Sequence, residues 1–263
     1  MSEHVTTARG DRVAFDHHGP EGAPAVVFIA GAGPYRATDH VTTPTAALLA
    51  EAGIQSTVHD RLGRGESSVD GPIDLAREID AIRALVDRVG GRAVLVGHSS
   101  GCSIALAAAA AGVPASALAL WEAPLTEDGA ATADWWGRCA DLIARGELER
   151  ALETYMEDMP PEFLEGARST PEFPTMVAQV VSYGPDGESL VWATARPLPE
   201  VLQDVDVPVV AAVGTETFPG MPEAAAAIAA ATGGTAIEVD GRWHSWEPAA
   251  MAAVLADLAR ANA

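Results

Sequence analysis

The chain has 263 residues, of which 48% are hydrophobic and 20% are charged, so it can bury one large core. Asp and Glu outnumber Lys and Arg by 37 to 16, which gives a formal net charge of −21 at pH 7. A surface this acidic repels phosphate backbones and anionic lipid headgroups, so we expect neither a nucleic acid nor a membrane as a partner. The sequence contains no lysine, which excludes Schiff-base chemistry on a lysine side chain.

The cysteine content and the N-terminus predict a cytoplasmic protein. Two cysteines, Cys102 and Cys139, are too few for a disulfide framework, and the first ten residues lack the apolar run of a secretory signal. The apolar stretch 103–121 is interrupted at 112–114, which predicts a buried helix followed by a strand and not a membrane span. The histidines and cysteines show no metal-ligand spacing, so we expect no metal and no other cofactor.

Short apolar runs alternate with helical patterns, which predicts an α/β fold with a mostly parallel, doubly wound sheet. The strands are expected at 11–18, 25–30, 55–60, 93–96, 117–121, 209–213 and 236–239. The helices are expected at 43–52, 72–89, 100–111 and 223–231 and from residue 248 onward. The run at 25–30, AVVFIA, has no polar residue, which is typical of a central strand buried on both faces.

The alternation lapses between the strands at 117–121 and 209–213. This stretch is helical with proline breaks, and residues 125–200 hold seven of the fourteen aromatic residues. We therefore predict a core of residues 1–124 and 201–263, with 125–200 inserted as a helical cap over an apolar pocket. The plainer alternative is a helical appendage whose aromatic residues only pack it onto the core. Trp192 is a candidate for substrate contact, with simple packing as its alternative.

A strand, the sequence Gly97-His98-Ser99-Ser100-Gly101 and a helix follow one another directly. In this G-x-S-x-G arrangement a sharp turn forces the serine into a strained backbone conformation and lifts its hydroxyl into a cleft. Ser99 then stands at a helix N-terminus, where free backbone N–H groups can receive an oxyanion. The sequence therefore predicts that Ser99 is a nucleophile.

Four segments in this order resemble landmarks of the α/β-hydrolases: 30–34, 60–67, 97–101 and 241–244. The resemblance implies an α/β-hydrolase fold, with the loop at 30–34 supplying part of an oxyanion hole. It implies the backbone N–H groups of Ala32 and Ser100 as oxyanion donors, with small Gly33 beside the substrate. It also implies that His244, which precedes the last helix, is the general base that takes the proton of Ser99.

The third member of the triad departs from the family pattern. Most members carry an aspartate after the strand at 209–213, where this sequence has Gly214-Thr215-Glu216-Thr217, with threonine in the acid position. Threonine cannot supply the negative charge that orients the base. Glu122, which follows the strand at 117–121, is one candidate acid, and Glu216 is the other. The sequence also leaves open that neither serves.

Within this family the chain resembles the zearalenone lactonases. It shares with them the G-x-S-S-G motif, a glutamate in the context Trp121-Glu122-Ala123-Pro124, and the cap segment Val191-Trp192-Ala193. The resemblance implies a serine hydrolase that cleaves an apolar ester or lactone, aromatic or macrocyclic, through an acyl-enzyme on Ser99. The alternatives are a ligand-binding receptor on the same scaffold and a non-hydrolytic enzyme that cleaves carbon–carbon bonds. The sequence also leaves open whether the chain forms a homodimer.

Overall fold

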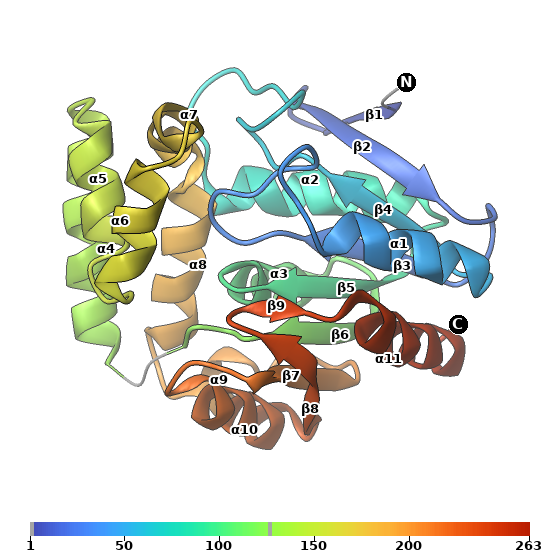
Figure 1. Ribbon diagram of the computed structural model, residues 1–263. Helices are drawn as coiled ribbons and strands as arrows, with labels where there is room; N and C mark the ends of the chain where they lie inside the picture. Colours follow the sequence, from blue (N-terminus) through green and yellow to red (C-terminus); the bar gives the residue numbers. More distant parts are fainter. Residues whose placement is uncertain (1–2, 126–127) are drawn as a thin grey trace.

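A nine-stranded sheet organises the residues that the computed structural model describes, 3–125 and 128–263 (Figure 1). Its strand order is β1-β2-β4-β3-β5-β6-β7-β8-β9, and the six strands from β4 to β8 in this order are parallel. The strands are β1 Glu3–Thr6, β2 Arg12–His18, β3 Ala25–Ile29, β4 Gln55–His59, β5 Ala93–His98, β6 Ala115–Trp121, β7 Val209–Glu216, β8 Thr235–Arg242 and β9 Ser245–Trp246. The predicted α/β fold is confirmed, and the sequence analysis missed only the short edge strands β1 and β9.

Helices cover both faces of this sheet (Figure 1). The helices α1 Thr42–Glu51 and α11 Pro248–Ala261 pack together over one face. The helices α2 Leu75–Arg88, α3 Gly101–Ala110 and α10 Met221–Thr232 cover the other face. In α2, the Asp74 side chain accepts a hydrogen bond from the Arg77 N–H and so caps the first turn. In the apolar stripe of that helix, Ile82 and Leu85 are fully buried and belong to the core cluster on this face of the sheet.

The chain forms further helices between β6 and β7 in the sequence. They lie at the edge of the sheet where the parallel strands end (Figure 1). They are α4 Gly129–Ala144, α5 Leu148–Tyr155, α6 Pro161–Arg168, α7 Phe173–Gln179, the 3-10 turn Val180–Ser182, α8 Gly184–Thr194 and α9 Leu198–Val201. A separate apolar cluster, with Tyr155 and Tyr183 at its centre, joins α4, α5 and α7. Residues 126 and 127 of the predicted cap segment lie outside the described residues.

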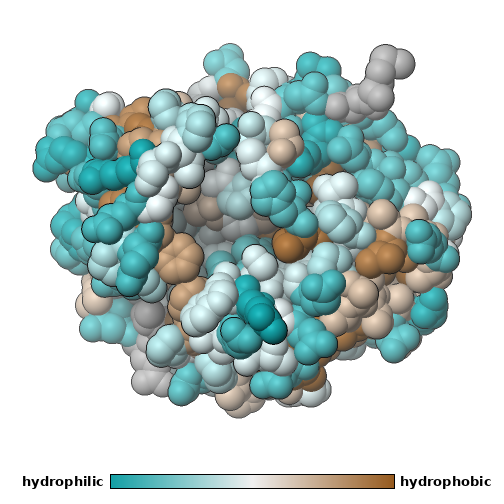
Figure 2. Space-filling model, in the orientation of Figure 1, coloured by the Kyte–Doolittle hydropathy of each residue, from teal (hydrophilic) through white to brown (hydrophobic). Residues whose placement is uncertain are grey.

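The molecular surface is hollowed between these helices and the carboxyl ends of the strands (Figure 2). In open α/β sheets this edge is where ligands bind, because the loops after the strands converge there. Within the two described ranges, no helix combines the length and apolar character needed to cross a membrane.

Candidate active site

Ser99 lies in a tight turn between β5, which ends at His98, and α3, which begins at Gly101. Its φ of 57° is in the left-handed region, and its N–H donates to the Trp121 carbonyl at 2.9 Å. A Cβ atom on Gly101 would lie 2.2 Å from the Ile29 carbonyl oxygen, so only glycine fits at this crossing of α3 and β3. The strained turn that the sequence predicts at Ser99 is therefore present.

Glu122 follows β6 directly and faces the imidazole of His244. Its Oε2 accepts a hydrogen bond from His244 Nδ1 at 2.6 Å, and its side chain is fully buried. Its other oxygen, Oε1, accepts hydrogen bonds from Gly214 N–H at 3.0 Å and Thr217 Oγ1 at 2.6 Å. Burial alone would raise the pKa of Glu122, but the hydrogen bonds from His244, Thr217 and Gly214 outweigh it and lower that pKa. Glu122 is therefore a carboxylate, and it can stabilise a protonated imidazole.

Glu216 lies elsewhere. It is the last residue of β7, it is exposed, and its Oε1 lies 3.3 Å from Arg242 Nε. Of the two acids that the sequence left open, the structure places Glu122 and not Glu216 against His244. The threonine in the usual acid position, Thr217, has a role that the sequence analysis missed, because its hydroxyl donates to the carboxylate.

His244 reaches the site on a hairpin between β8 and β9. Arg242 pairs with Ser245, so Trp243 and His244 are the two central residues of the turn. Both have positive φ, 48° and 74°, as the hairpin turns that match strand twist require. Glycine or asparagine normally fills such positions, so this turn is strained.

A second histidine, His98, binds the backbone of this hairpin. His98 Nε2 donates to the His244 carbonyl at 2.8 Å, and Trp121 Nε1 donates to the same oxygen at 3.2 Å. Burial, together with the nearby charge of His244, lowers the pKa of His98 to about 4. His98 is therefore neutral at pH 7, and it positions the backbone of His244 without competing for protons.

Backbone strain gathers at this constellation. Among residues 3–125 and 128–263, the non-glycine residues with positive φ are Ser99, Glu122, Trp243 and His244. Such conformations cost about 1–3 kcal/mol each and persist where the surroundings enforce them, commonly at active sites. The strained residues therefore include Ser99 and both partners of the Glu122–His244 hydrogen bond. Within the described residues, Ser99 Oγ and His244 Nε2 do not form a hydrogen bond with each other.

The oxyanion donors that the sequence analysis named lie beside Ser99 in different environments. The Ser100 N–H donates no hydrogen bond within the described residues, so it is free to receive a developing oxyanion. The Ala32 N–H donates to Ser100 Oγ at 3.1 Å. Gly33 has a φ of 98°, and the Tyr183 hydroxyl lies 3.3 Å from where a Cβ atom on it would stand.

Aromatic rings connect the imidazole with the helices above the sheet. The Phe218 ring lies 6.2 Å from the His244 ring, 5.8 Å from Trp243 and 5.6 Å from Phe163 of α6. We call Phe163, Phe218 and Trp243 the aromatic rim. The sequence analysis missed Phe218 and did not assign Trp243 a role. Trp192 is half-buried and packs against the core cluster beside α2 and α3, so the structure gives it a packing contact.

Known proteins share the fold of this chain. A model described as the alpha/beta hydrolase family matches residues 26–258. No curated protein matches the chain. Among solved structures, an alpha/beta hydrolase from Sphaerobacter thermophilus DSM 20745 is similar, with 27% identity and a TM-score of 0.82, over 97% of this chain and 99% of that one.

Two further solved structures share the fold at lower identity. A hydrolase from Pseudomonas aeruginosa PA01 has 20% identity and a TM-score of 0.70, over 98% of this chain and 97% of that one. The enol-lactonase from Burkholderia xenovorans LB400 has 18% identity and a TM-score of 0.65, over 97% of this chain and 99% of that one.

Proposed function

The chain belongs to the alpha/beta hydrolase family, and we propose that it hydrolyses carboxylic esters, including lactones, through an acyl-enzyme on Ser99. The observation that carries this proposal is the 2.6 Å hydrogen bond between His244 Nδ1 and Glu122 Oε2. A carboxylate in this position fixes the imidazole tautomer with the free Nε2 lone pair available as a base. His244 follows the last parallel strand and Ser99 follows β5, so both reach the carboxyl edge of one sheet.

The first half of the proposed reaction forms the acyl-enzyme. Ser99 Oγ attacks the ester carbonyl carbon while His244 Nε2 takes its proton, and Glu122 stabilises the imidazolium. The negative charge on the carbonyl oxygen is received by the N–H groups of Ser100 and Ala32. The C–O bond of the ester then breaks, and His244 returns the proton to the leaving alcohol oxygen. In a lactone this alcohol stays attached to the acyl group.

The second half releases the acid. A water molecule gives a proton to His244 Nε2 and attacks the acyl carbon, and the bond to Ser99 Oγ breaks as the proton returns to Ser99. The products are a carboxylic acid and an alcohol, or one hydroxy acid from a lactone. The same donors stabilise the oxyanion in both halves.

The aromatic rim supports an apolar substrate with an aromatic or macrocyclic part. Phe163 is 44% exposed and Trp243 is 60% exposed, and Phe218 links both to the His244 ring. Large exposed aromatic side chains beside an active site are typical of surfaces that bind apolar ligands. We propose that the helices between β6 and β7 act as a cap, that the substrate is a small molecule, and that Trp192 contributes to its pocket through the packing of α8.

The receptor alternative rests on the threonine in the usual acid position. Glu122 supplies a carboxylate to His244, and Thr217 donates to that carboxylate. The threonine in the usual acid position is therefore no argument for a receptor. The alternative of carbon–carbon bond cleavage uses the same residues, and it is tested by identifying the products of the reaction.

A fluorophosphonate probe tests the proposal directly. We expect one equivalent to label Ser99, as shown by a mass shift of its tryptic peptide, with parallel loss of p-nitrophenyl ester hydrolysis. Ser99→Ala should abolish both, whereas Ser68→Ala, at an exposed serine away from the site, should change neither. Hydrolysis by Ser99→Ala at the parent rate would overturn the serine mechanism.

A further inference from the structure

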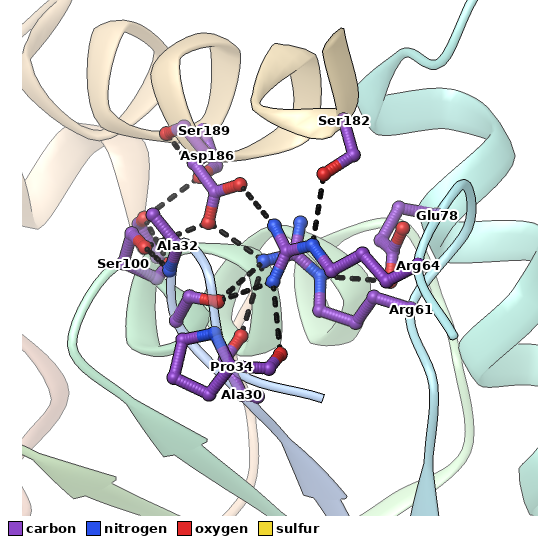
Figure 3. Close-up of polar contacts among 12 residues, drawn as sticks. Ala30, Ala32, Pro34, Arg61, Arg64, Glu78, Ser100, Ser182, Asp186 and Ser189 are labelled. Atoms are coloured by element: carbon purple, nitrogen blue, oxygen red, sulfur yellow. Dashed lines mark hydrogen bonds and ion pairs between the residues drawn. The ribbon is translucent and has the colours of Figure 1, made fainter. Parts of the chain in front are cut away.

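The peptide group between Gly31 and Ala32 is held at both ends (Figure 3). The Gly31 carbonyl oxygen accepts hydrogen bonds from Arg64 Nη1 at 2.6 Å and from Arg61 Nη1 at 3.2 Å. The Ala32 N–H donates to Ser100 Oγ at 3.1 Å. The proposed function uses the N–H group of this peptide as an oxyanion donor. Arg61, Arg64 and Ser100 therefore fix the orientation of that donor.

The carboxylate of Asp186 binds all three of these side chains. Asp186 Oδ1 accepts hydrogen bonds from Ser100 Oγ at 2.7 Å and Arg61 Nη1 at 2.6 Å, and its Oδ2 accepts from Arg64 Nη2 at 3.0 Å (Figure 3). Asp186 belongs to α8, one of the helices between β6 and β7, and it is completely buried. A single side chain of the proposed cap therefore fixes both arginines and Ser100, which lies in the turn between β5 and α3.

The charges of this network balance within the protein. Arg61 and Arg64 are 1% exposed, and they face Asp186 and a second buried acid, Glu78, whose Oε1 accepts from Arg61 Nε at 3.1 Å. Two positive and two negative groups therefore meet in a region without solvent. Buried charges are costly unless they are paired in good geometry, and replacing a whole buried ion pair with well-packed apolar residues is often neutral for stability. Stability alone therefore does not explain why four charges are buried beneath this loop.

The Gly31–Ala32 peptide lies against the nucleophile. A Cβ atom on Gly31 would stand 2.8 Å from Ser99 Cβ and 3.4 Å from Ser100 Oγ. In a trans peptide the carbonyl and the N–H group point in opposite directions, so arginines that clamp the carbonyl also aim the N–H. Positive charge on the carbonyl side polarises the peptide and strengthens its N–H as a donor.

We propose that Asp186 is a positioning residue for oxyanion stabilisation, which it exerts through Arg61, Arg64 and Ser100 on the Ala32 N–H. This inference rests on the proposed function and adds a role for the cap in it. Before the reaction, the Ala32 N–H is satisfied by the neutral Ser100 hydroxyl. In the tetrahedral intermediate the N–H keeps this orientation and also donates to the charged oxyanion, which is the stronger acceptor, while Ser100 continues to donate to Asp186.

Asp186→Asn tests this role, because an amide keeps the shape but removes the charge and places an N–H₂ group where one arginine now donates. We expect kcat for a p-nitrophenyl ester to fall by about 10- to 100-fold, with KM changed by less than about threefold. Complete removal of an oxyanion donor costs about 100- to 1,000-fold, and here the donor is misplaced but not removed. Affinity for 2-phenylethylboronic acid, which forms a tetrahedral adduct with the serine, should fall with kcat. Affinity for 2-phenylethanol, a neutral ligand without an oxyanion, should stay within about twofold.

A matched control separates this role from a general loss of stability. Asp11→Asn breaks another arginine–carboxylate pair, in which the buried Asp11 Oδ1 lies 2.6 Å from Nη1 of the partly buried Arg77, near the N-terminal end of α2. It should lower the melting temperature but leave kcat and the ratio of boronate to alcohol affinity unchanged. If Asp11→Asn reduced kcat as much as Asp186→Asn does, the positioning role would be wrong.

A second variant covers the case in which Asp186→Asn does not fold. Arg64→Lys keeps the charge, but one ammonium group cannot bridge Gly31 and Asp186 as the guanidinium does, so kcat and boronate affinity should again fall together. A parental ratio of boronate to alcohol affinity in the folded variants would overturn the inference. Such a result leaves the proposed function intact as long as the parent protein hydrolyses the ester and is labelled at Ser99. A parent that does neither overturns both.

Discussion

The hydroxyl of Thr217 lies 2.6 Å from Glu122 Oε1, on the opposite side of the carboxylate from the His244 ring. The residue in the family's usual acid position therefore donates to an acid that comes from the neighbouring strand. Because β6 and β7 are adjacent and parallel, a longer side chain after β6 reaches the place that a shorter one would occupy after β7. His244 therefore has a carboxylate partner, although this carboxylate follows β6 and the family's usual acid follows β7.

This contact predicts the effect of Thr217→Val, which keeps the shape and removes the donor. The hydrogen bond lowers the pKa of Glu122, so its loss raises that pKa, and the carboxylate becomes protonated at higher pH on acidification. We expect kcat/KM to fall about tenfold and its acidic limb to move to higher pH, as measured between pH 4 and 8. Thr217→Ser retains the hydroxyl and should behave as the parent. An unshifted limb in Thr217→Val would show that the hydroxyl does not tune the acid.

A matched pair of glutamate variants tests which acid serves. Glu122→Gln keeps the size of the side chain but removes the charge that stabilises the imidazolium, so we expect kcat to fall by about 10³- to 10⁴-fold. Glu216→Gln changes an exposed residue that faces Arg242, and it should leave kcat within about twofold. Steady-state hydrolysis of a p-nitrophenyl ester measures both. Equal losses in the two variants would contradict the assignment.

Much of this fold follows from local sequence patterns, since each parallel strand reads as a short apolar run. The run of Ala25–Ile29 is entirely buried, as predicted, because helices cover both faces of β3. The edge strands β1 and β9 escaped prediction because they have four and two residues, and tertiary pairing alone defines them. Ser99 and His244 were predictable from motif and order, and Glu122 was one of two candidates.

The rest of the site depends on contacts between distant segments. Asp186 lies 86 residues from Ser100 and 125 from Arg61 in sequence, and nothing local to α8 indicates that its acid is buried. The sequence analysis gave Arg61 no role beyond its place in the landmark segment 60–67, and in the structure it binds the carbonyl oxygens of Ala30 and Gly31. Phe218 likewise reaches His244 only through the folded loop after β7. Such roles are set by the tertiary arrangement and carry no motif.

Trp243 combines a strained backbone with an exposed ring, so two substitutions separate the two properties. Trp243→Asn tolerates positive φ and should increase the free energy of unfolding by about 1 kcal/mol, as measured by urea denaturation. The same change removes a ring of the aromatic rim, so KM should rise several-fold for aryl esters and not for acetate esters. Trp243→Phe keeps both the ring and the strain, and it should retain the parental KM without a gain in stability. Parental KM values for aryl esters in Trp243→Asn would remove Trp243 from substrate binding.

The buried acid Glu78 predicts how stability depends on pH. Burial would raise its pKa, but the charge of Arg61, followed by His59, whose Nε2 lies 3.9 Å from Glu78 Oε1, lowers it to about 2. The unfolded chain binds this proton near the ordinary glutamate pKa of about 4.3, so the stabilisation is complete above that pH and is lost as the pH falls toward 2. We therefore expect the free energy of unfolding to decrease between pH 5 and 3.

Glu78→Gln removes that titration but leaves Arg61 Nε without its carboxylate partner, while Arg61 Nη1 still donates to Asp186. The variant should be less stable than the parent at pH 6 and should lose less further stability on acidification to pH 3, as measured by urea unfolding at both pH values. Glu223→Gln, at an exposed position in α10, is the control and should preserve the parental difference. If Glu78→Gln lost as much stability between pH 6 and 3 as the parent does, the acid sensitivity would have to come from other carboxylates.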